Sequence, residues 1–203
     1  SKDIYDSGKK LLQIINEILD VSRIDVGERQ LNEGLVKMDG LIKGCLEFLS
    51  LKASENNLTI TNLTENSIPN IVGEELAIKQ VLINLLSNAI KYTPPGGRVT
   101  VSHETDGEGC LRISVTDTGI GLDEADIEKA LSPFGQIETS LDRTSSGAGL
   151  GLTLADALIK LHSGRLELFS QKGVGTTATI VFPPSRVSRS EGSTPQSAHS
   201  GRK

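Results

Sequence analysis

EELAIKQVLINLLSNAIKYTPPGG, residues 74–97, is the stretch that decides the fold of this chain. Asn84, Asn88 and Lys91 are spaced four and three residues apart, so in a helix they project from one face. The opposite face is a broad apolar stripe, which needs a sheet beneath it. Two prolines follow Thr93, and because a proline disfavours helical backbone in the residue before it, the helix should end there.

The polar face of this helix has two interpretations. One is a core helix with a solvated polar face, and the spacing alone is consistent with it. Solvated faces, however, are usually rich in lysine and glutamate, whereas this face carries two amides and one cation. Amide carbonyls and an ammonium group suit a hard metal ion and a phosphate chain. These residues alone leave both interpretations open.

Composition excludes several classes of protein. The 203 residues carry a net charge of −5 and only 3% aromatic residues, which argues against nucleic-acid binding. Cys45 and Cys110 lack metal-ligand spacing, so we expect buried, reduced thiols and a cytoplasmic setting. No apolar run approaches the ~20 residues that cross a bilayer, and we expect no signal peptide.

Residues 1–27 are predicted to form one helix that ends at Gly27. Leu11, Ile15 and Ile18 belong to a wide apolar stripe along it. Such a stripe needs partner helices, which a bundle or a dimer would supply; the alternative is that the helix packs against the downstream domain. The chain begins without methionine inside this pattern, so we expect it to be a fragment of a longer protein.

Downstream, strand and helix patterns alternate. Asp39 is expected to cap a helix, and Pro69 and Gly73 are expected to bracket a turn. Residues 132–146 have no hydrophobic period and are predicted to form a mobile loop, and 185–203 a disordered tail. The expected strands cover 34–39, 58–63, 98–104, 110–117, 164–170 and 176–182, and the further expected helices cover 39–55, 123–130 and 147–162.

Two glycine-rich stretches have the chemistry of a binding site. Residues 117–121, DTGIG, follow directly on a strand. A carboxylate there can accept a hydrogen bond from an exocyclic amine, and glycines let a ring lie against the backbone. Taken alone, the triplet is typical of a strand-ending turn. Residues 147–152, GAGLGL, open a helix, where backbone N–H groups can point at phosphates. This second signal is weak by itself.

The order of the motifs is more specific than any one of them. The asparagine helix, DTGIG, PFGQ at 133–136, GAGLGL and GVGTT at 173–177 resemble the ATP-binding domain of sensor histidine kinases over roughly residues 35–183. The resemblance implies an α+β fold, a two-layer α/β sandwich whose mixed, mostly antiparallel sheet is covered on one face by helices. Residues 1–27 resemble the second helix of that family's dimerisation and phosphoacceptor hairpin. The expected domains are therefore 1–27, the catalytic domain 28–184 and the tail 185–203.

The resemblance also implies ATP and Mg²⁺ as cofactors and gives roles to single residues. Asn88 is implied to ligate Mg²⁺ with Asn84 in support, and these two with Lys91 are the implied catalytic residues. Asp117 is implied to bind adenine N6 and Thr177 to line the adenine pocket. Phe134 and Arg143 are implied to lie in a lid. The implied nucleotide-binding residues are Asn84, Asn88, Lys91, Tyr92, Asp117, Gly119, Gly121, Phe134, Arg143, Gly147, Gly149, Leu150, Gly151, Leu152 and Thr177.

The predicted function is a sensor histidine kinase of a two-component system. None of the three histidines is followed by the pattern of the family's phosphoacceptor, so the acceptor is expected outside this chain. Two alternatives remain: a related ATPase, which would carry a glutamate base where Asn84 stands, and a regulatory module that binds nucleotide without turnover. The implied partners are a response regulator receiver domain and a second copy through the helix hairpin, with no nucleic acid and a membrane only through segments absent here.

Overall fold

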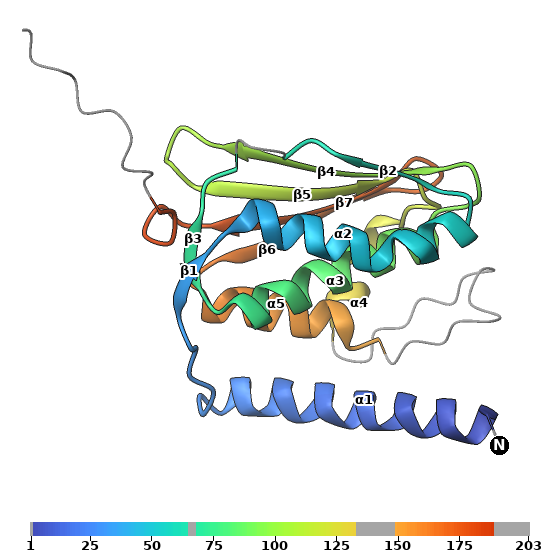
Figure 1. The fold of residues 1–203 in the computed structure, drawn as a ribbon, viewed down its shortest axis with the longest axis horizontal. Helices are drawn as coiled ribbons and strands as arrows, with labels where there is room; N and C mark the ends of the chain where they lie inside the picture. The colour runs from blue at the N-terminus through green and yellow to red at the C-terminus, as the bar shows by residue number, and fades with distance from the viewer. Residues whose placement is uncertain (1, 65–67, 133–148, 189–203) are drawn as a thin grey trace, which may run out of the picture.

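The computed structural model describes residues 2–64, 68–132 and 149–188 (Figure 1). Its main sheet has five strands in the order β2-β4-β5-β7-β6. The β2–β4 pair is parallel and the other neighbours are antiparallel, so the sheet is mixed and mostly antiparallel, as expected. The strands are β2 (Thr59–Asn62), β4 (Arg98–Thr105), β5 (Leu111–Asp117), β6 (Arg165–Gln171) and β7 (Gly175–Phe182).

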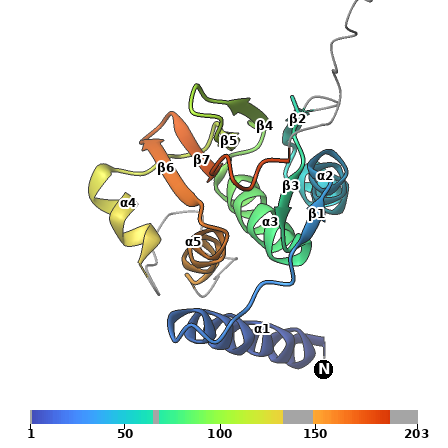
Figure 2. The same ribbon diagram turned by 90° about the vertical axis from the view of Figure 1, so that its left-hand side faces the viewer.

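Helices α2 (Met38–Glu55), α3 (Glu75–Tyr92) and α5 (Gly151–Leu161) lie against one face of this sheet (Figure 2). The apolar stripe of α3, including Ile78, Leu82 and Leu86, is buried in the core between the two layers. A short helix, α4 (Glu124–Leu131), lies beside α5 and β6. The two-layer α+β sandwich is therefore confirmed.

Strand β5 determines where the first glycine stretch begins. Its residues alternate between the two faces, and Leu111, Ile113 and Val115 point into the core below the helices. Asp117 continues this inward-facing row at the end of the strand and is also buried. The sheet thus places a carboxylate at the edge of its own core.

A second, two-stranded sheet corrects the expectation for residues 69–73. β3 (Ile71–Gly73) is a strand, not a turn, and pairs antiparallel with β1 (Gly34–Val36). Ile71 also bridges to Val187, and the Val72 N–H donates to the Arg186 carbonyl at 2.7 Å. Its partners lie far away in the chain, so the local signal of a proline and a glycine was misleading.

The start of α2 corrects a second expectation. The N-cap residue is Lys37, which makes no side-chain capping bond, and Asp39 lies inside the first turn. A carboxylate in the first turn still interacts favourably with the helix dipole. Asp39 therefore contributes to the helix start without capping it.

Helix α1 (Lys2–Asp25) packs against the downstream domain, as the alternative prediction had it, at its C-terminal end only. Near its C-terminus, Val21 and Ile24 pack against the core of the sandwich, and α1 contacts α5. Further toward the N-terminus, Leu11, Leu12 and Leu19 remain about half exposed, at 59%, 60% and 48%. No helix in the described ranges is long and apolar enough to cross a membrane.

His162 fastens the end of α5 to the start of α3. The ring is fully buried; Nδ1 donates to the Leu158 carbonyl at 2.7 Å, and Nε2 accepts from the Glu74 N–H at 3.1 Å. The side chain must be neutral to accept this bond. Burial lowers the pKa of His162, and the bond to the Leu158 carbonyl opposes that shift.

We expect His162 to make the protein less stable in mild acid. Because its folded pKa is lowered, its contribution is complete above the unfolded pKa of about 6.5 and is lost as the pH falls below it. Urea unfolding at pH 5 to 7.5 should show this loss for the wild type and a weaker dependence for His162→Gln. Equal pH dependence in the two proteins would contradict the expectation.

Candidate functional site

The Asp117 carboxylate lies at the centre of the polar residues that the sheet brings together. Its Oδ1 accepts the Gly119 N–H at 2.8 Å and the Thr176 N–H at 3.2 Å. Burial raises the pKa of Asp117 above its usual value, and these two bonds oppose the shift. Among the described residues, Oδ2 has no hydrogen-bond partner, so the carboxylate keeps one oxygen for a ligand that donates.

The turn after Asp117 is packed directly on the end of α3. The Ile120 N–H donates to the Tyr92 carbonyl at 3.1 Å. A Cβ on Gly119 would lie 2.5 Å from the same carbonyl oxygen and 2.6 Å from Asp117 Oδ1, so only glycine fits. Tyr92, one of the predicted residues on α3, is thereby placed beside the DTGIG stretch.

Two further glycines allow this turn to meet the β6–β7 hairpin. Gly121 has φ +62°, and a Cβ there would lie 1.9 Å from the Gln171 carbonyl oxygen. Gly175 has φ +139°, and its Cβ would lie 2.0 Å from the Asp117 carbonyl oxygen. The Gly173 N–H closes the arrangement by donating to the Ile120 carbonyl at 2.7 Å.

Asn84 and Asn88 lie on one half-buried face of α3, as predicted. The Asn84 Nδ2–H donates to the Gly151 carbonyl at 3.0 Å, which ties α3 to the first residue of α5. Asn84 therefore connects the two helices, whereas the Asn88 amide has no hydrogen-bond partner among the described residues.

Lys91 and Tyr92 form a pair at the end of the same helix. The Lys91 ammonium donates to the Tyr92 hydroxyl at 2.8 Å and lies 4.5 Å from the centre of its ring. The pair places a positive charge one turn beyond Asn88, where it would be near an anion held by that face.

The start of α5 differs from the expected helix 147–162. The helix begins at Gly151 with Leu150 as its N-cap residue, and Gly149, at φ +72°, turns the chain into it. Leu150 is buried and Leu152 packs against the core, so apolar contacts anchor both sides of the helix start. The hydroxyl of Thr153, in the first turn, is buried with no partner among the described residues.

Thr177 is not where the predicted role requires it. Its hydroxyl lies 3.1 Å from that of Thr116, on the face of the sheet where Phe169 is 73% exposed. Asp117 pairs instead with Thr176, whose side chain shares its face. Thr177 and Thr176 are neighbours in β7, and consecutive residues of a strand point to opposite faces of the sheet.

Three predicted residues, Phe134, Arg143 and Gly147, and most of the expected loop at 132–146 lie outside the described residues. Two residues at the site were missed. Thr176 was obscured by its neighbour Thr177, and Ser170, whose hydroxyl contacts Thr176, belongs to no motif that the sequence offered.

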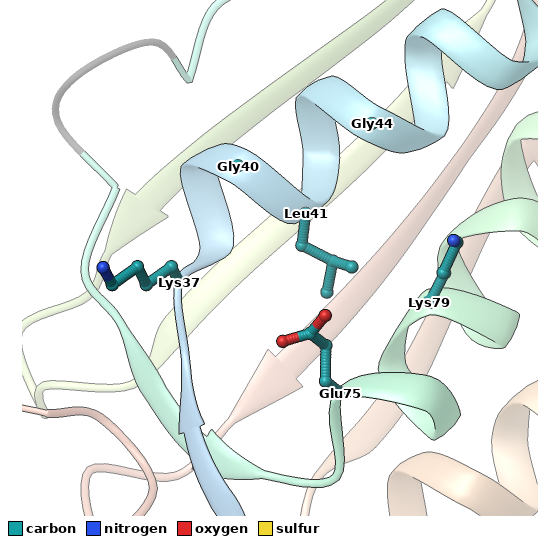
Figure 3. A pocket seen from close by; sticks show the side chains of 6 residues that line it. All are labelled: Lys37, Gly40, Leu41, Gly44, Glu75 and Lys79. Atoms are coloured by element: carbon teal, nitrogen blue, oxygen red, sulfur yellow. The ribbon is translucent and has the colours of Figure 1, made fainter.

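A pocket of about 320 Å³ lies between α2 and α3, away from these residues (Figure 3). Lys37, Glu75 and Lys79 line it together with the open backbone of Gly40 and Gly44. None of the predicted site residues contributes to it. The described ranges also contain no cluster of three acidic, histidine or cysteine side chains that could hold a metal.

The comparisons with known proteins agree on one family. Residues 73–186 match the model described as histidine kinase-, DNA gyrase B-, and HSP90-like ATPase. A Caulobacter vibrioides non-motile and phage-resistance protein is 39% identical over 90% of this chain and 22% of its own length. The Brucella suis cell-division control histidine kinase PdhS is 36% identical over 92% of this chain and 19% of its own length. The chain thus spans about a fifth of these relatives.

Solved structures extend this likeness to the fold. Full-length ShkA in complex with AMPPNP has a TM-score of 0.80 and 27% identity, covering 92% of this chain and 38% of that one. The catalytic domain of the histidine kinase ThkA has a TM-score of 0.63 and 27% identity, covering 77% of this chain and 99% of that one.

The glycine at position 121 provides a test of the packing described above. Gly121→Ala should destabilise the protein by about 2 kcal/mol or more, because the methyl group meets the Gln171 carbonyl and the backbone is in the left-handed region. Gly107→Ala is the matched control: its Cβ meets nothing within 4 Å, so the change should stay within about 0.5 kcal/mol. Equal unfolding free energies for the two variants would contradict this packing.

Proposed function

This chain belongs to the family of histidine kinase-, DNA gyrase B-, and HSP90-like ATPases, and we propose that it is the catalytic part of a sensor histidine kinase. In this proposal it binds Mg²⁺–ATP and transfers the γ-phosphate to a histidine outside residues 1–203. A response regulator receiver domain would take the phosphate onward, and α1 would pair with a second copy in a helical hairpin bundle.

The observation that carries the proposal is the Asn84–Gly151 hydrogen bond. The Asn84 amide can donate to the Gly151 carbonyl, whereas an ionised glutamate could not, because a carboxylate and a carbonyl are both acceptors. An amide also cannot take a proton from water, as a hydrolytic ATPase requires of its base. Residue 84 therefore favours transfer of the phosphate to a protein group over its hydrolysis.

Adenine would bind beside the Asp117 carboxylate. Its exocyclic amine would donate to Oδ2, the oxygen that the turn leaves without a partner among the described residues. Gly119 leaves no side chain between the base and the backbone. Thr176 takes the place first given to Thr177, because it lies on the same face as Asp117.

The phosphates would extend along the polar face of α3 toward the start of α5. Lys91 would neutralise part of their charge, and the free N–H groups of the first turn of α5 would donate to them. Gly149 and Gly151 leave this backbone open to a phosphate.

Mg²⁺ fits the residues present. Its usual protein ligands beside a nucleotide are one or two oxygens, with phosphate and water supplying the rest. Asn88 offers one such carbonyl oxygen, and Asn84 is oriented beside it by its bond to Gly151. When bound, the ion would offset charge on the phosphates.

None of the three histidines in the chain suits the role of phosphoacceptor. His162 is buried and its Nε2 is already an acceptor for the Glu74 N–H. His103 lies in β4 with a buried Nδ1 that has no partner among the described residues. His199 lies outside the described residues and lacks the acceptor pattern.

Label transfer tests the proposed reaction. The chain incubated with γ-labelled ATP and Mg²⁺ should remain unlabelled, and a separate fragment carrying an acceptor hairpin with its histidine should gain an acid-labile label. Release of free phosphate in place of labelling would favour the ATPase. A label on this chain mapped to His103, His162 or His199 would show that the acceptor is misplaced.

Asn88 tests the metal separately. Asn88→Ala should weaken Mg²⁺–ATP binding by about tenfold or more while leaving metal-free adenosine binding unchanged, because only the metal and phosphates meet this face. Lys79→Ala, on the pocket side of the same helix, is the control and should change neither affinity. Calorimetric titration of both ligands is the measurement. An equal loss for adenosine would make Asn88 a structural residue.

A further inference from the structure

The Ser170 hydroxyl, at the end of β6, joins three segments around Asp117. The Leu122 N–H donates to its Oγ at 2.8 Å. The same oxygen lies 3.1 Å from the Gly175 carbonyl oxygen and 2.8 Å from Thr176 Oγ1. Ser170 therefore contacts the loop after DTGIG, the turn before β7 and the first threonine of β7.

Counting protons fixes the direction of these bonds. A serine hydroxyl has one proton to donate and can accept two bonds. The Gly175 carbonyl can only accept, so the Ser170 proton points there. Ser170 then accepts from Leu122 and from the Thr176 hydroxyl, and this is the arrangement that satisfies all three contacts. The Thr176 hydroxyl proton is then engaged in the bond to Ser170, so toward any further partner Thr176 Oγ1 can only accept.

Thr176 lies directly beside the Asp117 carboxylate. The two residues are paired across β5 and β7, and the Thr176 backbone N–H donates to Asp117 Oδ1. Their side chains share one face of the sheet. Two oxygens that can only accept, Asp117 Oδ2 and Thr176 Oγ1, therefore occupy the same end of the site.

We propose that Ser170 is a positioning residue for purine selectivity. It holds the Thr176 hydroxyl as an acceptor, so that the site favours a purine with an amine at C6 over one with a carbonyl there. This inference rests on the proposed function, because it takes Asp117 to bind the C6 edge of the base. Ser170 touches no part of the nucleotide itself.

The chemistry of the two bases explains the effect. Adenine presents two N–H donors at C6, which suit a pair of acceptors, whereas hypoxanthine presents a carbonyl oxygen that such a pair repels. Without the Ser170 oxygen, the Thr176 hydroxyl has no fixed acceptor. Its proton can then rotate toward a C6 carbonyl, and the discrimination weakens.

ATP and ITP are the probes, because their bases differ at C6. In titrations of the full chain, Ser170→Ala should weaken ATP binding about three- to tenfold, as for one hydrogen bond, and leave ITP binding nearly unchanged. Ser114→Ala is the matched control. It removes a similar hydroxyl pair, Ser114 with Thr179 at 2.9 Å, from the opposite face of the same sheet, and should leave the ATP-to-ITP ratio at the wild-type value.

Two further variants separate positioning from folding. Ser170→Thr keeps a hydroxyl and should restore the wild-type ratio. In a Thr176→Val background, Ser170→Ala should no longer change the ratio, because the hydroxyl that it orients is gone. An unchanged ratio in Ser170→Ala, with ATP and ITP weakened alike, would make Ser170 merely structural and overturn the inference. Wild-type protein that binds neither nucleotide would instead overturn the proposed function, and this inference with it.

Discussion

The buried carboxylate of Asp117 is the constraint on which the rest of the site depends. A charge at the edge of an apolar core is costly unless hydrogen bonds compensate for it. Here the backbone N–H groups of Gly119 and Thr176 supply that compensation to one oxygen. Both bonds require the chain to turn back tightly, and glycines at 119 and 175 make the close approach possible. The second oxygen is thereby oriented and left to a ligand.

Much of the fold could be predicted because its long elements carry strong local patterns. Helix α3 and the strands β4, β5, β6 and β7 lie within a residue or two of their expected places. The failures occur where long-range partners decide the structure. β3 is a strand only because β1 and residues 186–188 pair with it. Neither the hydrophobic periodicity of residues 69–73 nor the turn residues among them can indicate this long-range pairing.

The site divides in a similar way. The asparagines and the DTGIG stretch could be predicted because their spacing is visible within one helix and one turn. The Ile120–Tyr92 bond attaches that turn to the end of the helix that carries the asparagines. Thr177 was misplaced because GTT offers two threonines, and only strand pairing tells which one faces Asp117. Ser170 could not be predicted because a single serine in a strand gives no sequence signal. Its contacts become visible only when the neighbouring strands of the sheet are known.

Helices α3 and α5 are connected to each other by two hydrogen bonds that involve side chains. Asn84 holds the first residue of α5, and His162, just beyond the last, holds the N-terminus of α3. Helix α1 reaches this pair through α5, against which its C-terminal half packs. A displacement of α1 that moved α5 relative to α3 would change the geometry of the Asn84–Gly151 bond. The Asn84–Gly151 bond is thus one of the contacts that hold the start of α5, and with it the glycine-rich turn, against α3.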